Sequence, residues 1–231
     1  MTFISRRDLL KQAAAVGAVA AASMDGAAAP AAVDGARAFQ ASDPAGARPA
    51  DAGSQHIARE PLESLTATEA DLLDAIVARL IPTDANGPGA TEARAVHYID
   101  RALGGALSPF REAYRSGLAA LDRYSRGSRG KAFTELTPSD QDSVLVDVET
   151  GAATGFVGSS AGFFALVLAH THQGTFGDPY YGGNANFVGW DLIGYPGVRT
   201  MVTAADQLRL EKNDLKANHK SAYDDDSFTK A

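Results

Sequence analysis

The sequence predicts an all-α protein with one small helical domain, and three observations support this fold class. Apolar residues recur at steps of three and four in several segments, as they do on one face of a helix. Ser108-Pro109 and Thr137-Pro138 each place a capping residue before a proline at the first helical position. No segment alternates apolar and polar residues as a half-buried strand does. A long irregular loop, rich in glycine and aromatic residues, is expected near the C-terminal end.

The first helix is expected to start after Thr66 and to stop before Pro82. Thr66 and Glu69 have the spacing of a capping box, in which each side chain satisfies a free backbone N–H of the first turn. Proline at position 82 cannot continue the helix. The predicted buried face consists of Leu72, Leu73, Ile76, Val77 and Leu80.

Three more helices are expected after the first. The second is expected from about Thr91 to Gly104, and the third from Ser108 until the polar segment 125–131 breaks it. The fourth starts at Thr137. Its apolar residues are Val144, Leu145 and Val148.

A fifth helix is expected to open at Ser159 or Ser160, and it is apolar almost all round. Such a helix belongs in the centre of a core. From Gly174 to Gly197 neither helical nor strand periodicity holds, so this stretch is predicted to be the irregular loop. A last helix is expected from Val198 to about Leu210.

The N-terminus has the pattern of a twin-arginine export signal. Ser5, Arg6, Arg7, Leu10 and Lys11 form its core, and a weakly apolar run follows that is too short to span a bilayer. Small residues indicate cleavage near residue 31. The expected organisation is therefore a signal peptide (1–31), a flexible leader (32–62), the helical domain (63–212) and a polar acidic tail (213–231).

Charge and composition exclude several classes of protein. The 231 residues carry a net charge of −7, and the signal segment carries +1, so the exported chain is acidic without a basic cluster. Nucleic-acid binding needs clustered Lys and Arg to neutralise phosphates. The chain has no cysteine, so disulfides, thiolate-ligated iron–sulfur clusters and covalently attached haem c are excluded. No Gly-x-Gly-x-x-Gly or phosphate-loop motif is present.

The histidines before the predicted loop invite a metal-site hypothesis, with His170 and His172 as ligands and Asp178 and Asp191 as extra ligands. Residues two apart on a helix point to nearly opposite faces, whereas a helical metal pair needs a spacing of three or four. His170 shares a face with apolar residues of the fifth helix, which favours a hydrogen-bonded histidine at the core edge. No Gly-x-Ser-x-Gly motif indicates a serine hydrolase.

The aromatic residues of the predicted loop have two interpretations that the sequence leaves open. Tyrosine and tryptophan combine a large apolar area with a polar tip, which suits a protein–protein interface. In the other interpretation, the loop folds back and these aromatic side chains pack against the domain's own core.

The twin-arginine start, the Leu80-Ile81-Pro82 end of the first helix and above all the loop resemble the gluconate 2-dehydrogenase subunit 3 family. The resemblance covers residues 65–197. The residues that carry it, expected to form the partner interface or the frame of the loop, are His170, Gly174, Phe176, Asp178, Pro179, Tyr181, Gly182, Gly183, Asn184, Trp190, Gly194, Tyr195, Pro196 and Gly197.

The resemblance implies a small subunit without catalytic activity or cofactor of its own, in a periplasmic sugar or polyol dehydrogenase complex. The large partner would hold FAD and belong to the glucose-methanol-choline group, and a multihaem cytochrome c could anchor the complex to the membrane. The small subunit would support maturation of the flavoprotein and carry it through the twin-arginine translocase. Two alternatives are a periplasmic metal-dependent enzyme using His170, His172 and Asp178, and a module that binds sugars on the aromatic loop.

Overall fold

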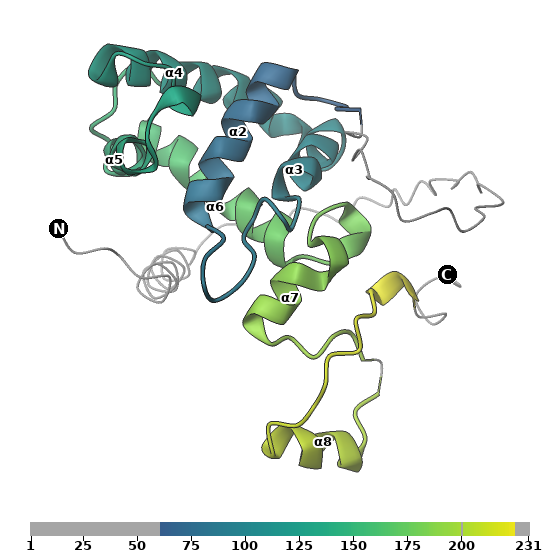
Figure 1. The fold of residues 1–231 in the computed structure, drawn as a ribbon. Coiled ribbons are helices and arrows are strands. Elements are labelled where there is room, and N and C mark those ends of the chain that lie inside the picture. The colour runs from purple at the N-terminus through teal and green to yellow at the C-terminus, as the bar shows by residue number, and fades with distance from the viewer. Residues whose placement is uncertain (1–60, 200, 225–231) are drawn as a thin grey trace, which may run out of the picture. The chain divides into compact units, whose positions relative to one another are not determined.

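The computed structural model of this protein describes residues 61–199 and 201–224. The predicted signal peptide, including Arg6 and Arg7, lies outside the described residues, as does the leader up to residue 60. Within the described ranges every regular element is a helix, apart from an isolated bridge between Asp84 and Gly87. The predicted all-α class is therefore confirmed (Figure 1).

Helix α2 (Ala67–Leu80) forms where the capping box and the apolar periodicity predict it. The Thr66 hydroxyl accepts the Glu69 N–H at 3.3 Å, and the Glu69 carboxylate accepts the Thr66 N–H at 2.8 Å. The buried side chains of α2 are those of the predicted face: Leu72, Leu73, Ile76, Val77 and Leu80.

The next two helices have different bounds from those predicted. Helix α3 spans Ala95–Gly104, because Arg94 has a left-handed backbone (φ 59°) that a continuous helix cannot contain. A 3₁₀ turn, η1 (Ser108–Phe110), leads into α4 (Arg111–Arg129). The polar segment 125–131 does not break α4 where expected. The hydroxyls of Ser125 and Ser128 donate to backbone carbonyls one turn earlier, at 2.9 and 2.8 Å, so these polar side chains are satisfied within the helix.

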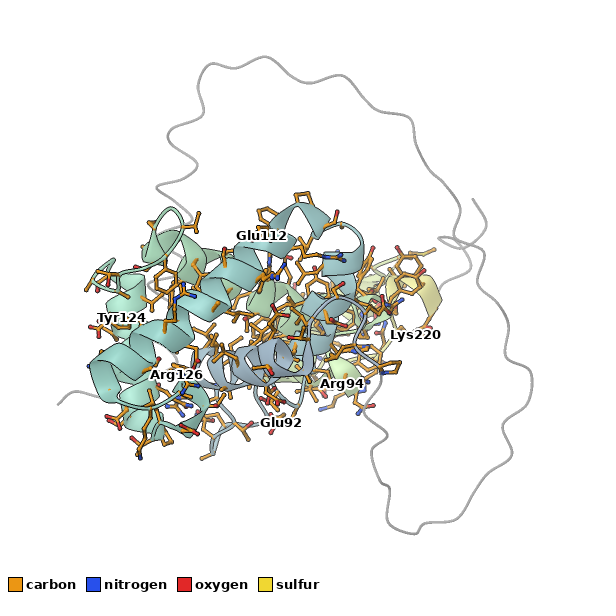
Figure 2. The ribbon with its side chains drawn as sticks, turned by 90° about the horizontal axis from the view of Figure 1, so that it is seen from above. Glu92, Arg94, Glu112, Tyr124, Arg126 and Lys220 are labelled. Atoms are coloured by element: carbon orange, nitrogen blue, oxygen red, sulfur yellow. The ribbon has the colours of Figure 1, made fainter. Side chains whose placement is uncertain are left out.

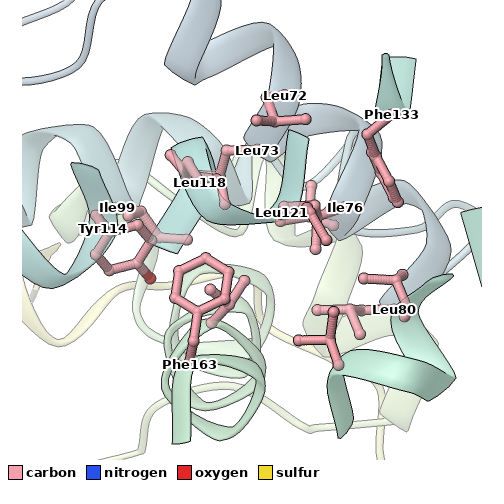
Figure 3. Packing of buried hydrophobic residues seen from close by; sticks show 14 of the residues in the cluster. Leu72, Leu73, Ile76, Leu80, Ile99, Tyr114, Leu118, Leu121, Phe133 and Phe163 are labelled. Carbon is pink, nitrogen blue, oxygen red and sulfur yellow. The ribbon is translucent and has the colours of Figure 1, made fainter. Parts of the chain in front are cut away.

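Helix α6 is the central helix of the domain, as its apolar composition predicts. The turn η2 (Phe133–Glu135) precedes α5 (Pro138–Glu149), and α6 (Ser160–Phe176) follows with Ser159 as its cap. Helix α6 contacts α2, α3, α4, α5 and α7. Figure 3 shows Phe163 of α6 pointing towards Tyr114, and the two rings meet edge to face with centroids 6.4 Å apart.

The stretch 174–197 is more regular than predicted, and it is called the aromatic segment below. Its first residues belong to α6, which ends at Phe176, and α7 (Val188–Ile193) forms near its end. Two 3₁₀ turns, η3 (Pro179–Tyr181) and η4 (Ala185–Phe187), occupy the middle. Figure 1 shows α7 beside the C-terminal end of α6.

The last helix, α8 (Ala204–Glu211), starts six residues later than the predicted Val198, because the capping box of Thr203 and Asp206 fixes its start. A final turn, η5 (Ala222–Asp224), lies within the expected polar tail. Among the residues that the structure describes, none of the helices combines the length and apolar character needed to cross a bilayer.

Candidate functional site

Asn184 holds the aromatic segment against the end of α6. Its backbone N–H donates to the Gly174 carbonyl at 2.7 Å, and its side-chain amide donates to the Gly177 carbonyl at 2.8 Å. Its side-chain oxygen accepts the Gly189 N–H at 2.8 Å, in the first turn of α7. Only 1% of Asn184 is exposed, and its backbone is left-handed, a conformation that asparagine tolerates. One side chain thus joins α6 to α7.

Close backbone contact between α6 and α7 completes this junction. A Cβ atom on Gly189 would meet the Thr175 carbonyl oxygen far inside van der Waals distance, so this position requires glycine. Trp190 is 5% exposed, and its indole N–H donates to the Phe176 carbonyl at 2.9 Å. The Tyr195 ring lies against Trp190 in an edge-to-face contact with centroids 4.7 Å apart. Trp190 therefore belongs to the interior of the junction.

Other aromatic and apolar side chains of the same segment face solvent. Their exposed fractions run from 37% for Tyr195 to 55% for Ile193. We call these residues the exposed face; they are Tyr180, Tyr181, Ile193 and Tyr195. The structure thus divides the aromatic residues of the segment into a buried frame and an exposed face, which the sequence alone could not do.

His170 lies at the edge of the core, as its helical face predicts. It is buried, its Nδ1 lies 3.0 Å from the Tyr114 hydroxyl, and its ring stacks on that of Tyr114. Phe110 covers the ring from another side in an edge-to-face contact. Desolvation lowers the pKa of His170, because burial penalises the charged imidazolium. Burial also raises the pKa of Tyr114, so both partners remain neutral at physiological pH.

The residues of the metal-site hypothesis are not brought together as a ligand set. Asp178 accepts the Tyr180 N–H, the Ser221 hydroxyl and the Ala222 N–H at 2.6 to 2.9 Å. His172 lies beside the Phe176 ring, and desolvation lowers its pKa. In the described part of the chain no group of three or more His, Cys, Asp or Glu residues is placed to hold a metal ion.

The remaining candidate residues shape the backbone of the segment. Gly182 ends η3 and Gly194 ends α7, and both have left-handed backbones, at φ 95° and 67°. Pro179 opens η3, and Gly183 packs against Gly174. Pro196 and Gly197 contact Asn218, from outside the segment.

Asp100 is a structurally important residue that sequence reasoning missed. It is 1% exposed, and its carboxylate accepts the backbone N–H groups of Glu63, Ser64 and Leu65 at 2.7 to 2.9 Å. The available signal was an acidic residue directly after the apolar Ile99, within the second predicted helix.

A shallow surface pocket of about 410 Å³ lies between α4 and the connector that follows α5. It contains none of the candidate site residues that the sequence predicted. Its lining consists of Ala120, Arg123, Tyr124, Gly127, Ser128, Thr154 and Gly155.

Comparison with known proteins shows which family has a helical domain and an aromatic segment like those of this chain. The family model of gluconate 2-dehydrogenase subunit 3 matches residues 67–197, which is more than half of the chain. The match runs from the first residue of α2 to the end of the aromatic segment. No curated protein and no solved structure gives a significant match. Since the family model covers most of the helical domain and the whole aromatic segment, the chain belongs to the gluconate 2-dehydrogenase subunit 3 family.

Proposed function

We propose that this chain is the non-catalytic small subunit of a periplasmic, FAD-dependent sugar or polyol dehydrogenase complex. The flavin resides in a partner of the glucose-methanol-choline type, and a cytochrome c subunit can accept its electrons. The small subunit supports maturation of the flavoprotein and carries it through the twin-arginine translocase. The observation that carries the proposal is the family match over residues 67–197, which makes the chain an accessory subunit of a dehydrogenase.

The geometry of the aromatic segment supports a role in binding a partner. Exposed tyrosines on a rigid support lose little side-chain entropy when they are buried, which favours them at interfaces. Asn184 and Trp190 supply that support, since each is buried and each hydrogen-bonds to a backbone group of another element. We assign the exposed face as the part of the segment that contacts the flavoprotein.

The N-terminal sequence supports the export role. Arg6 and Arg7 lie in the pattern of a twin-arginine export signal. The twin-arginine route carries folded proteins. A folded flavoprotein that binds the small subunit in the cytoplasm would cross the membrane with it. Loading of the flavin would then precede export.

Capture of the flavoprotein by the small subunit tests the proposal. The two chains are co-expressed, the small subunit is affinity-purified, and bound flavin is measured by absorbance. We expect flavoprotein in the wild-type eluate and at least a tenfold loss with Ile193→Ala/Tyr195→Ala, because these residues contribute exposed apolar area to the proposed contact.

Val157→Ala is the matched control, since Val157 is an apolar side chain with 83% exposure outside the aromatic segment. It should leave capture unchanged. Failure of the wild-type subunit to retain any flavoprotein would overturn the proposed function. Equal capture by all variants would overturn only the assignment of the exposed face.

A further inference from the structure

Residues Asn218–Tyr223 lie beyond the family match and yet run back over the aromatic segment. We call these six residues the strap. Three of its side chains, two residues apart, each contact a different part of the segment. His219 Nε2 lies 2.7 Å from an Asp191 carboxylate oxygen, and the Ser221 hydroxyl donates to Asp178 at 2.6 Å. Tyr223 stacks on Tyr180 with ring centroids 3.5 Å apart.

Backbone contacts reinforce this pattern. The Ala222 N–H donates to the second oxygen of Asp178 at 2.8 Å, so one carboxylate binds both a side chain and the main chain of the strap. The Asn218 N–H donates to the Pro196 carbonyl at 3.2 Å. A Cβ atom on Gly197 would overlap the Asn218 side-chain oxygen, so glycine at position 197 leaves room for the strap.

Other residues of the aromatic segment also contact the strap. Phe187 has a left-handed backbone, at φ 61°, which a bulky residue adopts only when its surroundings hold it. Its ring stacks on the His219 imidazole with centroids 5.1 Å apart. The Tyr181 hydroxyl lies 2.9 Å from that of Tyr223. Carboxylates and aromatic rings therefore alternate along the path of the strap.

The chain between the segment and the strap packs little against the core, and it is tied to the base of the strap by bonds from Arg199 to the Lys216 carbonyl at 2.9 Å and from the Asn218 side-chain amide to the Val198 carbonyl at 2.6 Å. Helix α8 has no buried residue, and Leu208 and Leu210 on it are 55% and 61% exposed. The strap can therefore separate from the segment without opening the core around α6. The contacts between the strap and the aromatic segment resemble those between a protein and a bound peptide.

From these contacts we infer that the aromatic segment is a peptide-binding site for a His-x-Ser-x-Tyr sequence, and that its ligand is the chain's own strap. Asp191 recognises the histidine, Asp178 the serine and the following N–H, and Tyr180 the tyrosine ring. Main-chain hydrogen bonds and separate contacts for alternate side chains are the means by which proteins bind extended peptides. The bound strap adds Tyr223, which is 38% exposed, to the surface beside Tyr180 and Tyr181.

A peptide added in trans tests the inference on the full mature chain. The triple variant His219→Ala/Ser221→Ala/Tyr223→Ala removes the recognised side chains and leaves the site open. A synthetic peptide of residues 213–226 is then titrated in, and the fluorescence of Trp190, the only tryptophan of the chain, reports binding. We expect saturable binding to the triple variant and at least tenfold weaker binding to the wild-type chain, whose own strap occupies the site.

Two control peptides define the specificity. Lys220 is exposed between the contacting residues (Figure 2), so a peptide with Lys220→Ala should bind as well as the native sequence. A peptide with all three contact residues replaced by alanine should not bind. The site variant Asp178→Asn, added to the triple variant, should weaken binding of the native peptide at least tenfold.

The outcomes separate clearly. Absence of peptide binding to a triple variant with wild-type helical content, or equal binding of the alanine peptide, would overturn the inference. If the triple variant does not fold, faster hydrogen exchange at the Ala222 amide in Tyr223→Ala than in wild type supports the inference, and unchanged exchange contradicts it. No partner is present in the assay, so its failure leaves the proposed function untouched.

Discussion

Asp100 fixes the point at which the helical domain begins. Its two carboxylate oxygens accept three consecutive N–H groups of residues 63–65, which directly precede the cap of α2. The side chain of Arg111 also donates to the Ser64 hydroxyl, at 3.1 Å. Asp100 on α3 and Arg111 on α4 thereby join the entering chain to two helices.

Replacement of Asp100 by alanine should destabilise the domain by about 2–4 kcal/mol, because the three N–H groups lose their acceptor and one of them is buried. Urea unfolding followed by circular dichroism measures the change. Asp71→Ala provides the control, since Asp71 is exposed on α2, and it should have little effect. A loss no larger than that of the control would show that Asp100 does not anchor the chain.

His170 makes the stability of the domain depend on pH. Burial lowers its pKa in the folded state, so below the ordinary value of about 6.5 the unfolded chain binds a proton that the folded chain does not. Its contribution to stability is therefore present at neutral pH and is lost as the pH falls. His172, whose pKa is also lowered by burial, acts in the same direction.

The thermal midpoint of the wild-type chain should accordingly fall between pH 7.5 and pH 5.5. His170→Gln should reduce this fall, because the variant lacks one of the groups that gain a proton on unfolding. Scanning calorimetry at the two pH values compares the slopes. An equal or larger fall in the variant would contradict the assignment of this pH dependence to His170.

At the scale of elements, the junction of α6 and α7 depends on contacts that periodicity does not reveal. Helix α7 has six residues, too few for an apolar face to repeat. The bond from Gly189 to the Asn184 side chain supports its first turn, and backbone contact at Gly189 brings it against α6. Such support is tertiary, which explains why the sequence predicted an irregular loop here.

Gly189→Ala should therefore loosen the junction, since the added methyl group cannot be accommodated against the Thr175 carbonyl without moving α7. We expect faster hydrogen exchange at the Gly183 to Trp190 amides and a red shift of Trp190 fluorescence. Gly127→Ala is the control. Its Cβ would meet open space within α4, so it should stabilise the chain by up to about 1 kcal/mol. Unchanged exchange in Gly189→Ala would contradict the close-contact account.

Local signals in the sequence predicted the scaffold better than the site. The capping boxes and cap–proline pairs fixed the starts of α2 and α5, because both devices act within a few residues. The late start of α3 depends on the left-handed Arg94, and the strap depends on contacts between residues about 40 positions apart. Neither has a local pattern. The burial of Trp190 also has no local pattern, because its indole bonds to the Phe176 carbonyl, 14 residues earlier in the chain.

For the whole molecule, we propose a helical support that presents the exposed face of the aromatic segment to a larger enzyme. The family match and the division of the aromatic segment into frame and face agree with such a role. The Arg6-Arg7 pattern would give that proposed role a direction, because in the proposed complex the subunit that carries the export signal determines where the partner is delivered.

The location of the flavoprotein in cells that express Arg6→Lys/Arg7→Lys tests whether this subunit carries its partner across the membrane. Dehydrogenase activity and bound flavin are measured in periplasmic and cytoplasmic fractions, with Arg37→Lys/Arg48→Lys in the predicted leader as the matched control. We expect the signal variant to retain both the small subunit and the flavin-loaded partner in the cytoplasm, while the control exports both. Normal periplasmic activity of the flavoprotein in the signal variant would contradict the proposed export role.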